Sequence, residues 1–324
     1  MKHYFQCILA GLILFAFMNE CVAAGKIISP EMSILFRIVD DAGNPVPNVS
    51  CRGWIRQFDV KGGGRSYSLT SDANGVVAIN AKCSVSFTAF FSKEGYYMSR
   101  LEPCLDADGA GSAVVDGKWQ PYGETRTVVL KKIRNPGALK VPQSLIRLEV
   151  DVPAYGEWLP FDLERFDWVA PRGSGSRDDV LLRFRRRVTE KWNDFKYEMD
   201  VTFTNNPYAG VVAMKKDVKS NFTTAYNADP GADYKPTLHF FLERTPKGGS
   251  KSFVLDKDSY LVFRTRTTVD SEGKLKTAHY GTIHGDWMPG KKSMSFADGC
   301  FNPTPNDTNI EDGHQLREIL RNER

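Results

Sequence analysis

The sequence lacks the features that mark the more extreme protein classes. Its 43 basic and 39 acidic residues nearly cancel to a net charge of +4, so charge alone does not indicate a nucleic-acid partner. Six cysteines in 324 residues are too few for a disulfide-dense miniprotein. No internal repeat and no low-complexity tract is present. The hydrophobic fraction of 41% and the charged fraction of 25% are typical of a globular chain with one or two domains.

Long hydrophobic runs are also absent beyond the first 24 residues, so we expect no membrane span in the rest of the chain. Those 24 residues begin with the basic Lys2, continue with an apolar run over 7–18, and end in small residues around Ala24. This order is typical of a secretory signal peptide. It predicts removal of residues 1–24 and a periplasmic or extracellular protein. The alternative is an uncleaved N-terminal anchor.

Signal cleavage would leave four cysteines, an even number that favours disulfides in an oxidising compartment. The extended runs 83–92 and 96–105 flank a turn at 93–95, and a hairpin centred there places Cys83 opposite Cys104. We therefore expect a Cys83–Cys104 disulfide, since directly opposed strand positions meet its geometric requirement. The remaining pair, Cys51 and Cys300, would then bridge two modules. The alternative for Cys51 is a buried thiol in a core.

Apolar residues alternate with polar ones almost throughout the chain, and turn signals recur at short spacing, which predicts a β-sandwich. The first module is expected over residues 32–133, and residues 134–143, with two prolines and a glycine, are expected to be a linker. A larger β-rich region of unknown function follows over 144–310. Leu316, Ile319 and Leu320 have helical spacing and predict a short helix over 311–322. Strands in the second region are expected at 145–150, 180–188, 197–204, 238–243, 260–268 and 276–283.

Two of these strands can be paired on both faces at once. If 180–188 and 197–204 form an antiparallel hairpin whose paired numbers sum to 385, Phe184 lies opposite Val201 on the apolar face. On the polar face, Arg185 then lies opposite Asp200, and Arg187 lies opposite Glu198. Arginines at alternate positions could also form an anion-binding stripe. We favour a charge-paired, solvated sheet face because acidic residues are expected opposite two of the arginines.

Three turn segments, at 43–51, 70–75 and 93–96, resemble the carboxypeptidase regulatory-like domain, a family with a transthyretin-like (prealbumin-like) β-sandwich. In that family the module is usually non-catalytic and accompanies enzymes, receptors and adhesins, so the resemblance implies architecture alone. The second region resembles the C-terminal half of uncharacterised exported bacterial proteins that carry the same module. The segments that suggest this are 161–162, 167–171, 280–283, 285–286, 301–304 and 306–307.

Motifs for catalysis are scarce. No His-x-x-Glu pair, His-Glu-x-x-His motif or Gly-x-Ser-x-Gly motif occurs, which excludes a carboxypeptidase-type zinc site and the usual nucleophile elbow. The best polar constellation is His279, His284 and Asp286, whose imidazoles and carboxylate would suit a divalent metal if the fold brought them together. The alternative places His279 on a sheet face and leaves His284 and Asp286 in a turn.

Acidic residues also lie close to aromatic ones over residues 158–168. Trp158, Glu164, Asp167 and Trp168 are the candidate ligand-binding residues, because carboxylates beside aromatic platforms occur in sugar-cleaving enzymes and carbohydrate-binding modules. The alternative is a set of core aromatics with solvated acids.

The sequence therefore favours a non-catalytic binding or structural protein outside the cytoplasm, recognising carbohydrate or protein at the cell surface. The alternative is an exported hydrolase, metal-dependent in one version, with its site in the second region. The sequence identifies no cofactor. It predicts no nucleic-acid partner and no membrane span after signal cleavage.

Overall fold

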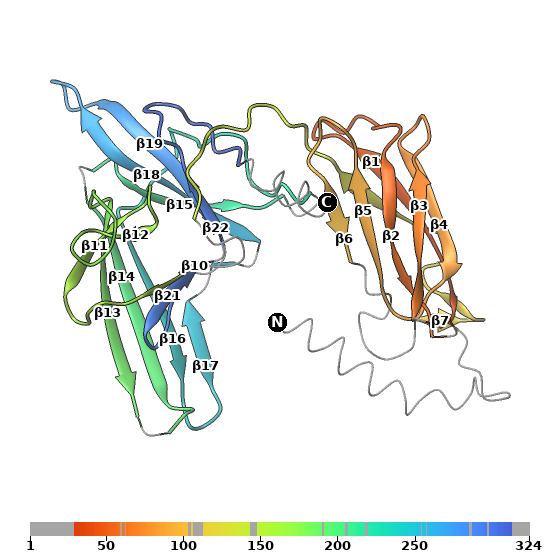
Figure 1. The fold of residues 1–324 in the computed structure, drawn as a ribbon, viewed down its shortest axis with the longest axis horizontal. Coiled ribbons are helices and arrows are strands. Elements are labelled where there is room, and N and C mark those ends of the chain that lie inside the picture. The colour runs from red at the N-terminus through yellow and green to blue at the C-terminus, as the bar shows by residue number, and fades with distance from the viewer. Residues whose placement is uncertain are drawn as a thin grey trace. The chain divides into compact units, whose positions relative to one another are not determined.

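The computed structural model describes residues 29–312, apart from 59, 62, 103–104, 106–112, 143–147, 190, 205–206, 218–219, 254, 257, 285–286 and 297. Strands and connecting turns make up this part of the chain, and it contains no helix (Figure 1). The predicted mainly β class is confirmed. The predicted signal segment lies outside the described residues, and so does the predicted C-terminal helix from residue 313 onward.

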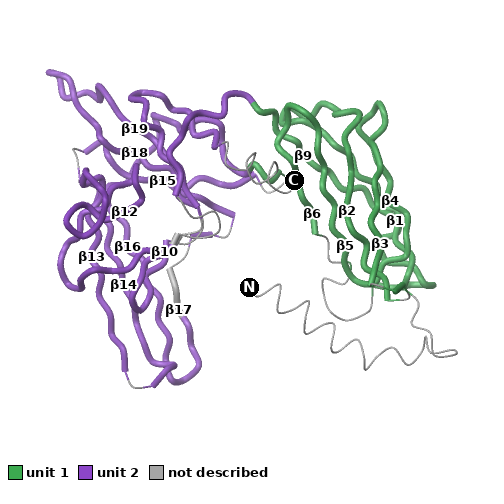
Figure 2. Tube along the Cα trace, in the orientation of Figure 1, with its two compact units in different colours: residues 1–133, 218–222 green, residues 134–217, 223–324 purple. Residues whose placement is uncertain are grey.

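The chain forms two compact units (Figure 2). The first unit comprises Met1–Ile133 and a short segment from later in the chain, Val218–Phe222. The second unit comprises Arg134–Asp217 and Thr223–Arg324. In the first unit, the Phe222 ring is buried and stacks on Tyr97, with 4.4 Å between ring centroids.

The first unit is a sandwich of two sheets. One sheet has the order β4-β1-β8-β7 with β9 also paired to β1, and the other has the order β3-β2-β5-β6. Its described strands are β1 (Glu31–Val39), β2 (Ser50–Arg56), β3 (Gly64–Thr70), β4 (Val76–Lys82), β5 (Phe87–Ser92), β6 (Ser99–Leu101), β7 (Val114–Val115), β8 (Lys118–Trp119) and β9 (Glu124–Val129). Alternate residues of β1, among them Ile34 and Phe36, are buried between the sheets. Phe36 meets Phe91 of the opposite sheet edge-on, with centroids 5.0 Å apart.

The hairpin that suggested the first disulfide forms in a different register. β5 and β6 pair with numbers that sum to 190, as in Phe90 opposite Arg100, whereas Cys83 opposite Cys104 needs a sum of 187. The predicted register of this hairpin is therefore wrong. The pairing itself stays a prediction, because residue 104 lies outside the described residues.

The second unit contains three sheets. They have the orders β12-β11-β13-β14-β16-β17, β15-β18-β19-β22 and β10-β21-β20. The described strands are β10 (Leu148–Asp151), β11 (Trp158–Asp162), β12 (Asp167–Trp168), β13 (Val180–Val188), β14 (Phe195–Phe203), β15 (Gly210–Lys215), β16 (Thr237–Arg244), β17 (Ser250–Phe253), β18 (Ser259–Val269), β19 (Leu275–His284), β20 (Met288–Pro289), β21 (Ser293–Phe296) and β22 (Asp298–Phe301). All six strands predicted for this region overlap a strand of the structure.

The main core of the second unit contains residues from all three sheets. Phe184 of β13, Phe263 of β18 and Met294 of β21 belong to this one buried cluster. A smaller cluster, with Tyr260 and Tyr280, is formed by the neighbouring residues of β18 and β19, which point to the other face of their sheet. β18 is consequently buried on both faces along most of its length, so any charged side chain in it needs a partner.

The β13–β14 hairpin has its predicted faces but not its predicted register. Paired numbers sum to 383, so Phe184 lies opposite Met199 and Arg183 lies opposite Asp200. The shift of two residues keeps every side chain on its expected face, because side chains alternate with period two. Arg185 still contacts Asp200, at 2.6 Å along the diagonal. Arg187 pairs with Asp194 at 2.7 Å and not with Glu198.

Cys51 and Cys300 are free thiols, each fully buried in its own unit. Cys51 belongs to the core of the first unit, as the alternative interpretation of the sequence had it. Cys300 lies in β22, where its sulfur is 3.2 Å from the hydroxyl of Thr282. The predicted Cys51–Cys300 bridge is not formed. In the described part of the chain no helix is both long and apolar enough to cross a membrane.

Candidate functional site

The predicted metal-binding histidines do not converge. His279 and His284 are five residues apart in β19, which places them on opposite faces of the sheet. His279 stacks on Phe301, and its Nδ1 lies 3.1 Å from the carbonyl oxygen of Asn302. His284 stacks on Tyr260 with centroids 5.4 Å apart. The two histidines therefore do not share a site, and Asp286 lies outside the described residues.

The environment of His284 also disfavours a charged imidazole. Burial lowers the pKa of His284 to about 4, and the nearby charge of Lys216 acts in the same direction. Among the described residues, no group of three or more His, Cys, Asp or Glu side chains could hold a metal ion. The metal-site prediction therefore has no support from the described part of the second unit.

Two of the candidate ligand-binding residues have structural roles. Trp168 is buried in the core, and its indole N–H donates to the carbonyl oxygen of Asp151 at 2.7 Å. The Asp167 carboxylate accepts hydrogen bonds from the backbone N–H and the hydroxyl of Ser174, both at 2.7 Å, which fixes the loop after β12. For these two residues the interpretation as core and loop residues is the better one.

Glu164 belongs to a buried ion cluster centred on Arg266. The Arg266 guanidinium donates to both oxygens of Asp179, at 2.9 and 3.0 Å, and to Asp162 at 3.2 Å. A further hydrogen bond joins it to Glu164. The side chains of Asp162 and Asp179 are each only 1% exposed, and Arg266 is 12% exposed. Among the ion pairs of the described residues, those of this cluster are the most deeply buried.

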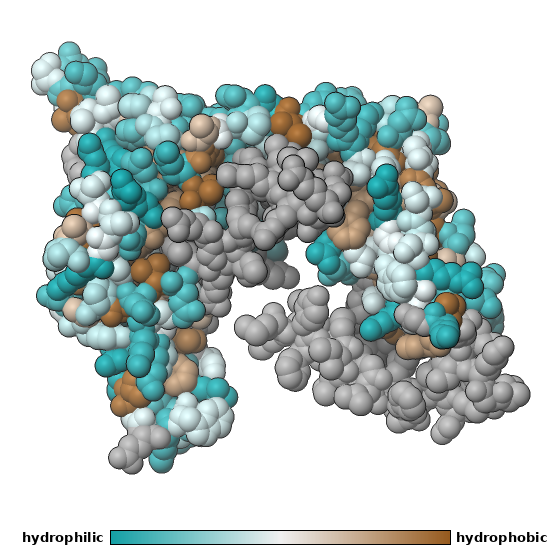
Figure 3. All heavy atoms as spheres, in the orientation of Figure 1, coloured by the Kyte–Doolittle hydropathy of each residue, from teal (hydrophilic) through white to brown (hydrophobic). Residues whose placement is uncertain are grey.

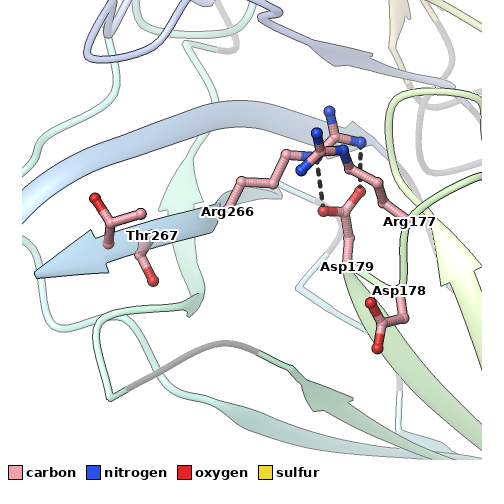
Figure 4. A pocket seen from close by; sticks show the side chains of 6 residues that line it. Arg177, Asp178, Asp179, Arg266 and Thr267 are labelled. Atoms are coloured by element: carbon pink, nitrogen blue, oxygen red, sulfur yellow. Dashed lines mark hydrogen bonds and ion pairs between the residues drawn. The ribbon is translucent and has the colours of Figure 1, made fainter.

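A bulge in β18 aims Arg266 at these carboxylates. Between Thr265 and Thr268, two residues of β18 oppose one of β19, and Arg266 has a left-handed φ of 50°. Strict alternation would place Arg266 on the face opposite Thr265. The bulge instead lets both side chains reach Asp179, since the Thr265 hydroxyl also bonds its Oδ1 at 3.2 Å. Figure 4 shows Asp179 turned towards Arg266 and Asp178 turned away.

The two buried aspartates respond differently to this environment. Burial raises the pKa of Asp179 above its usual value, and the Arg266 hydrogen bonds and charge offset only part of that effect. Asp162 is also buried, but backbone N–H groups of Ser176, Arg165 and Glu164 bond its carboxylate and bring its pKa below the usual value. The charge of Arg266 acts in the same direction.

Beside the cluster lies a small, open cavity of about 220 Å³, lined by Arg177, Asp178, Asp179, Arg266, Thr267 and Thr268. Its most polar groups, the Arg266 guanidinium and the Asp179 carboxylate, are already bonded to each other. The chemistry of the cluster is therefore that of an ion-paired link. It joins the turn after β11, the start of β13 and the bulge of β18.

A second polar arrangement crosses the six-stranded sheet on its solvent side. One row of paired positions contains Trp158 of β11, Arg183 of β13, Asp200 of β14 and His239 of β16. We call these four residues the indole row. Trp158 is 40% exposed, and the Arg183 guanidinium covers one face of its ring at 4.5 Å from the centroid.

Asp200 holds the indole row together. Its carboxylate accepts hydrogen bonds from Arg183 at 2.9 Å and from Arg185 at 2.6 Å, and it lies 2.8 Å from His239 Nδ1. Although partial burial opposes ionisation, the bonds to Arg185, His239 and Arg183 lower the pKa of Asp200 to about 2. The carboxylate is therefore ionised at any pH near neutrality, and it fixes the side chains around Trp158.

The sequence pattern indicates Trp158 and Glu164 as site residues, but it does not indicate Arg266, Asp162, Asp179 or His239. One signal was available for Arg266, because a charged residue inside the otherwise apolar run 260–268 requires a buried partner. The identity of that partner was not available, since the three carboxylates come from segments about 90 to 100 residues earlier.

No protein-family model matches the chain, and no curated protein matches it. Some solved structures are similar to parts of it. A 3-chlorocatechol 1,2-dioxygenase from Rhodococcus opacus 1CP has 13% identity and a TM-score of 0.26, with 32% of this chain and 61% of that chain covered. A catechol 1,2-dioxygenase from Pseudomonas arvilla C-1 has 14% identity and a TM-score of 0.26, with 41% and 70% covered.

A streptococcal ancillary pilin is similar over a longer stretch, 70% of this chain and 59% of that chain, at 12% identity and a TM-score of 0.21. The chain thus spans less than two thirds of the length of the first dioxygenase and of the pilin. Similarities at these identities and TM-scores carry no argument about activity.

Proposed function

We propose that the protein is an exported, non-catalytic binding protein that recognises carbohydrate through the indole row of its second unit. The observation that carries the proposal is the placement of an exposed indole, a guanidinium, an ionised carboxylate and an imidazole in one line across four strands. The opposite face of the same sheet packs into the main core of the unit.

A sugar ring presents an apolar C–H face and many hydroxyl groups that both donate and accept hydrogen bonds. The indole of Trp158 offers a partner for the C–H face of the sugar. Arg183 covers one side of the ring, and the residue is still 40% exposed to solvent. Arg183 donates to Asp200 through Nε and Nη2. No described contact uses its Nη1 hydrogens, so these can donate to a sugar hydroxyl. Asp200 and the arginines are already fixed to each other, which lowers the entropy cost of binding.

The balance of polar and apolar groups on this face favours a glycan over a protein. On one side of the row, the next paired positions are Arg185, Glu198 and Phe241, and the row after them contains Lys196. Protein interfaces need a desolvated apolar core with charge depleted at its centre. A largely hydrated, charge-paired face suits a ligand made of hydroxyl groups.

Two features of the sequence support the same proposal. The N-terminal segment has the order of a signal peptide, and export would bring the protein to cell-surface glycans. The first unit resembles the carboxypeptidase regulatory-like domain in its turn segments, and that module usually accompanies a functional domain without acting itself. We assign recognition to the second unit for this reason.

The direct test is a pull-down of the purified mature protein with insoluble chitin, cellulose and peptidoglycan, together with a glycan array. We expect at least one glycan to retain the wild type. Trp158→Ala should weaken binding by roughly ten-fold or more, since an exposed aromatic anchor is lost. Binding should change little with salt if the glycan is neutral.

Trp54→Ala is the matched control, because Trp54 is similarly exposed, at 44%, but lies in the first unit. It should leave binding unchanged. Circular dichroism would confirm that both variants are folded. Failure of every glycan to bind, or equal binding by wild type and Trp158→Ala, would overturn the proposal.

A further inference from the structure

A second surface of the same sheet is independent of the indole row. Beyond the main core, the core-side face of the sheet continues for two more rows of paired residues. The first contains Arg186, Tyr197 and Leu242, and the second contains Val188, Phe195 and Arg244. Four of these six residues are apolar or aromatic, so the face stays rich in apolar side chains beyond the main core.

Along this face, the side chains become more exposed to solvent towards the β13–β14 turn. Phe184 and Met199 are fully buried, and Tyr197 is 8% exposed beside Arg186, which stacks on Tyr155 at 4.1 Å. Val188, one row further, is 44% exposed. At the end of the sheet, Trp192 is 76% exposed, more than any other large hydrophobic residue of the described chain.

Two hairpin turns lie next to each other at this end, because Phe195 pairs with Arg244. The β13–β14 turn carries Lys191 and Trp192, and the β16–β17 turn carries Lys247. The Arg244 guanidinium lies 4.8 Å from the Trp192 ring centroid. We call Val188, Lys191, Trp192, Arg244 and Lys247 the hairpin-end patch. Figure 3 shows brown hydrophobic side chains among teal ones at this lower end of the second unit.

The charge of this end is positive. Residues 187–198 and 243–251 contain six basic and four acidic residues, and one of these acids, Glu198, is bonded to Lys196 at 2.8 Å. Another of the acids, Asp194, is bonded to Arg187 at 2.7 Å, and Glu243 lies 3.6 Å from the same arginine. The cations at the tips, Lys191 and Lys247, extend beyond these internal pairs along the sheet. The complementary partner is therefore anionic and offers an apolar layer for an indole.

We propose that the hairpin-end patch binds the surface of an anionic phospholipid bilayer. A tryptophan beside lysines and an arginine matches the composition of the interfacial region, where the indole lies at headgroup depth and the cations contact phosphates. Trp192 occupies the tip of a turn, so it can enter this layer without breaking any strand pairing. The surface lies at one end of the sheet, apart from the indole row, and both can be occupied at once.

The test is co-sedimentation of the mature protein with phosphatidylcholine vesicles that contain or lack phosphatidylglycerol. We expect binding only to the anionic vesicles, and a large loss of binding in high salt, since the attraction is screened. Trp192→Ala and the double variant Lys191→Ala/Lys247→Ala should each reduce the partition by roughly ten-fold.

Trp54→Ala and Trp158→Ala serve as controls that remove an exposed tryptophan elsewhere, and both should sediment like the wild type. Tryptophan fluorescence should shift to shorter wavelength on adding anionic vesicles, and this shift should vanish in Trp192→Ala. No binding to anionic vesicles, equal binding to neutral vesicles, or unchanged binding by Trp192→Ala would overturn the proposal. Glycan binding by Trp192→Ala reports on the indole row separately.

Discussion

Arg266 and Asp179 form a two-point contact in which Nε and Nη2 of the arginine bond the two carboxylate oxygens at 2.9 and 3.0 Å. Arg266 lies on the four-stranded sheet of the second unit, and Asp179 immediately precedes β13 of the six-stranded sheet. The contact therefore links two sheets through a buried charge pair. A planar, forked guanidinium is needed for it, and lysine cannot replace that geometry.

Removing either partner of this contact should destabilise the second unit. Breaking a buried ion pair leaves an uncompensated charge and typically costs about 3–5 kcal/mol. We expect Arg266→Ala and Asp179→Ala to lower the melting temperature markedly, and Arg266→Lys to recover only part of the loss. Thermal unfolding followed by circular dichroism measures the effect.

Arg177→Ala is the matched control, because Arg177 lines the same cavity but is exposed. A surface substitution of this kind should change stability by less than about 0.5 kcal/mol. Equal effects of Arg177→Ala and Arg266→Ala would show that the buried pair does not stabilise the unit.

Residue patterns could predict the strands because burial on one face imposes a period of two. They could also predict which side of the β13–β14 hairpin is charged. They could not fix its register, since Asp200 lies between Arg183 and Arg185 and contacts both. Long side chains reach diagonal positions, so the Arg185–Asp200 pair forms in either register.

The ion cluster around Arg266, unlike the strands, could not be predicted from residue patterns. Its geometry depends on a single inserted residue in β18, which turns Arg266 towards Asp179. Nothing in the local sequence marks that bulge, because neither glycine nor proline is present between Thr265 and Thr268. Carboxylates brought from β11 and from the start of β13 complete the site, and only tertiary packing can bring them there.

Asp200 should make stability depend on pH at the acidic end. Its pKa in the folded protein, about 2, lies below its unfolded value, so its contribution is fully present above about pH 4 and is lost as pH falls through about 2. The shift corresponds to roughly 2 kcal/mol. Denaturant unfolding of wild type and Asp200→Asn between pH 2 and 7 should therefore differ most near neutrality and converge in acid.

His239→Ala provides a check on this interpretation, since it removes a partner of Asp200 without removing the carboxylate. The acid dependence of this variant should be smaller than that of the wild type but still present. A difference between wild type and Asp200→Asn that is constant over the whole pH range would contradict the assignment.

Phe222 should stabilise the first unit, although it is distant from that unit in sequence. Its ring is 2% exposed, stacks on Tyr97 and lies 5.3 Å from Nζ of Lys131. Truncating a buried phenylalanine to alanine typically costs about 3–5 kcal/mol. Phe222→Ala should increase amide hydrogen exchange in peptides containing Tyr97, measured by mass spectrometry on the whole chain.

Phe58→Ala is the control, because Phe58 belongs to the same unit but is 50% exposed. It should leave exchange around Tyr97 near the wild-type level. Unchanged exchange in Phe222→Ala would mean that the buried ring adds nothing to the stability of that region.

The cysteines can be tested in one labelling experiment. Burial raises the pKa of both Cys51 and Cys300 to about 12, so their thiols stay protonated near pH 8 and should resist iodoacetamide in the native protein. In denaturant without reductant, both should be alkylated, as expected for free thiols. Peptide mapping by mass spectrometry identifies each site.

The same map separates the two disulfides expected from the sequence. If Cys83 and Cys104 are bonded, their peptides stay unlabelled in denaturant until a reductant is added, while those of Cys51 and Cys300 do not. Labelling of all four cysteines in denaturant before reduction would contradict the predicted Cys83–Cys104 disulfide. Protection of Cys51 and Cys300 until reduction would contradict the free thiols of the structure, because a buried thiol loses its protection once the chain unfolds, whereas a disulfide does not.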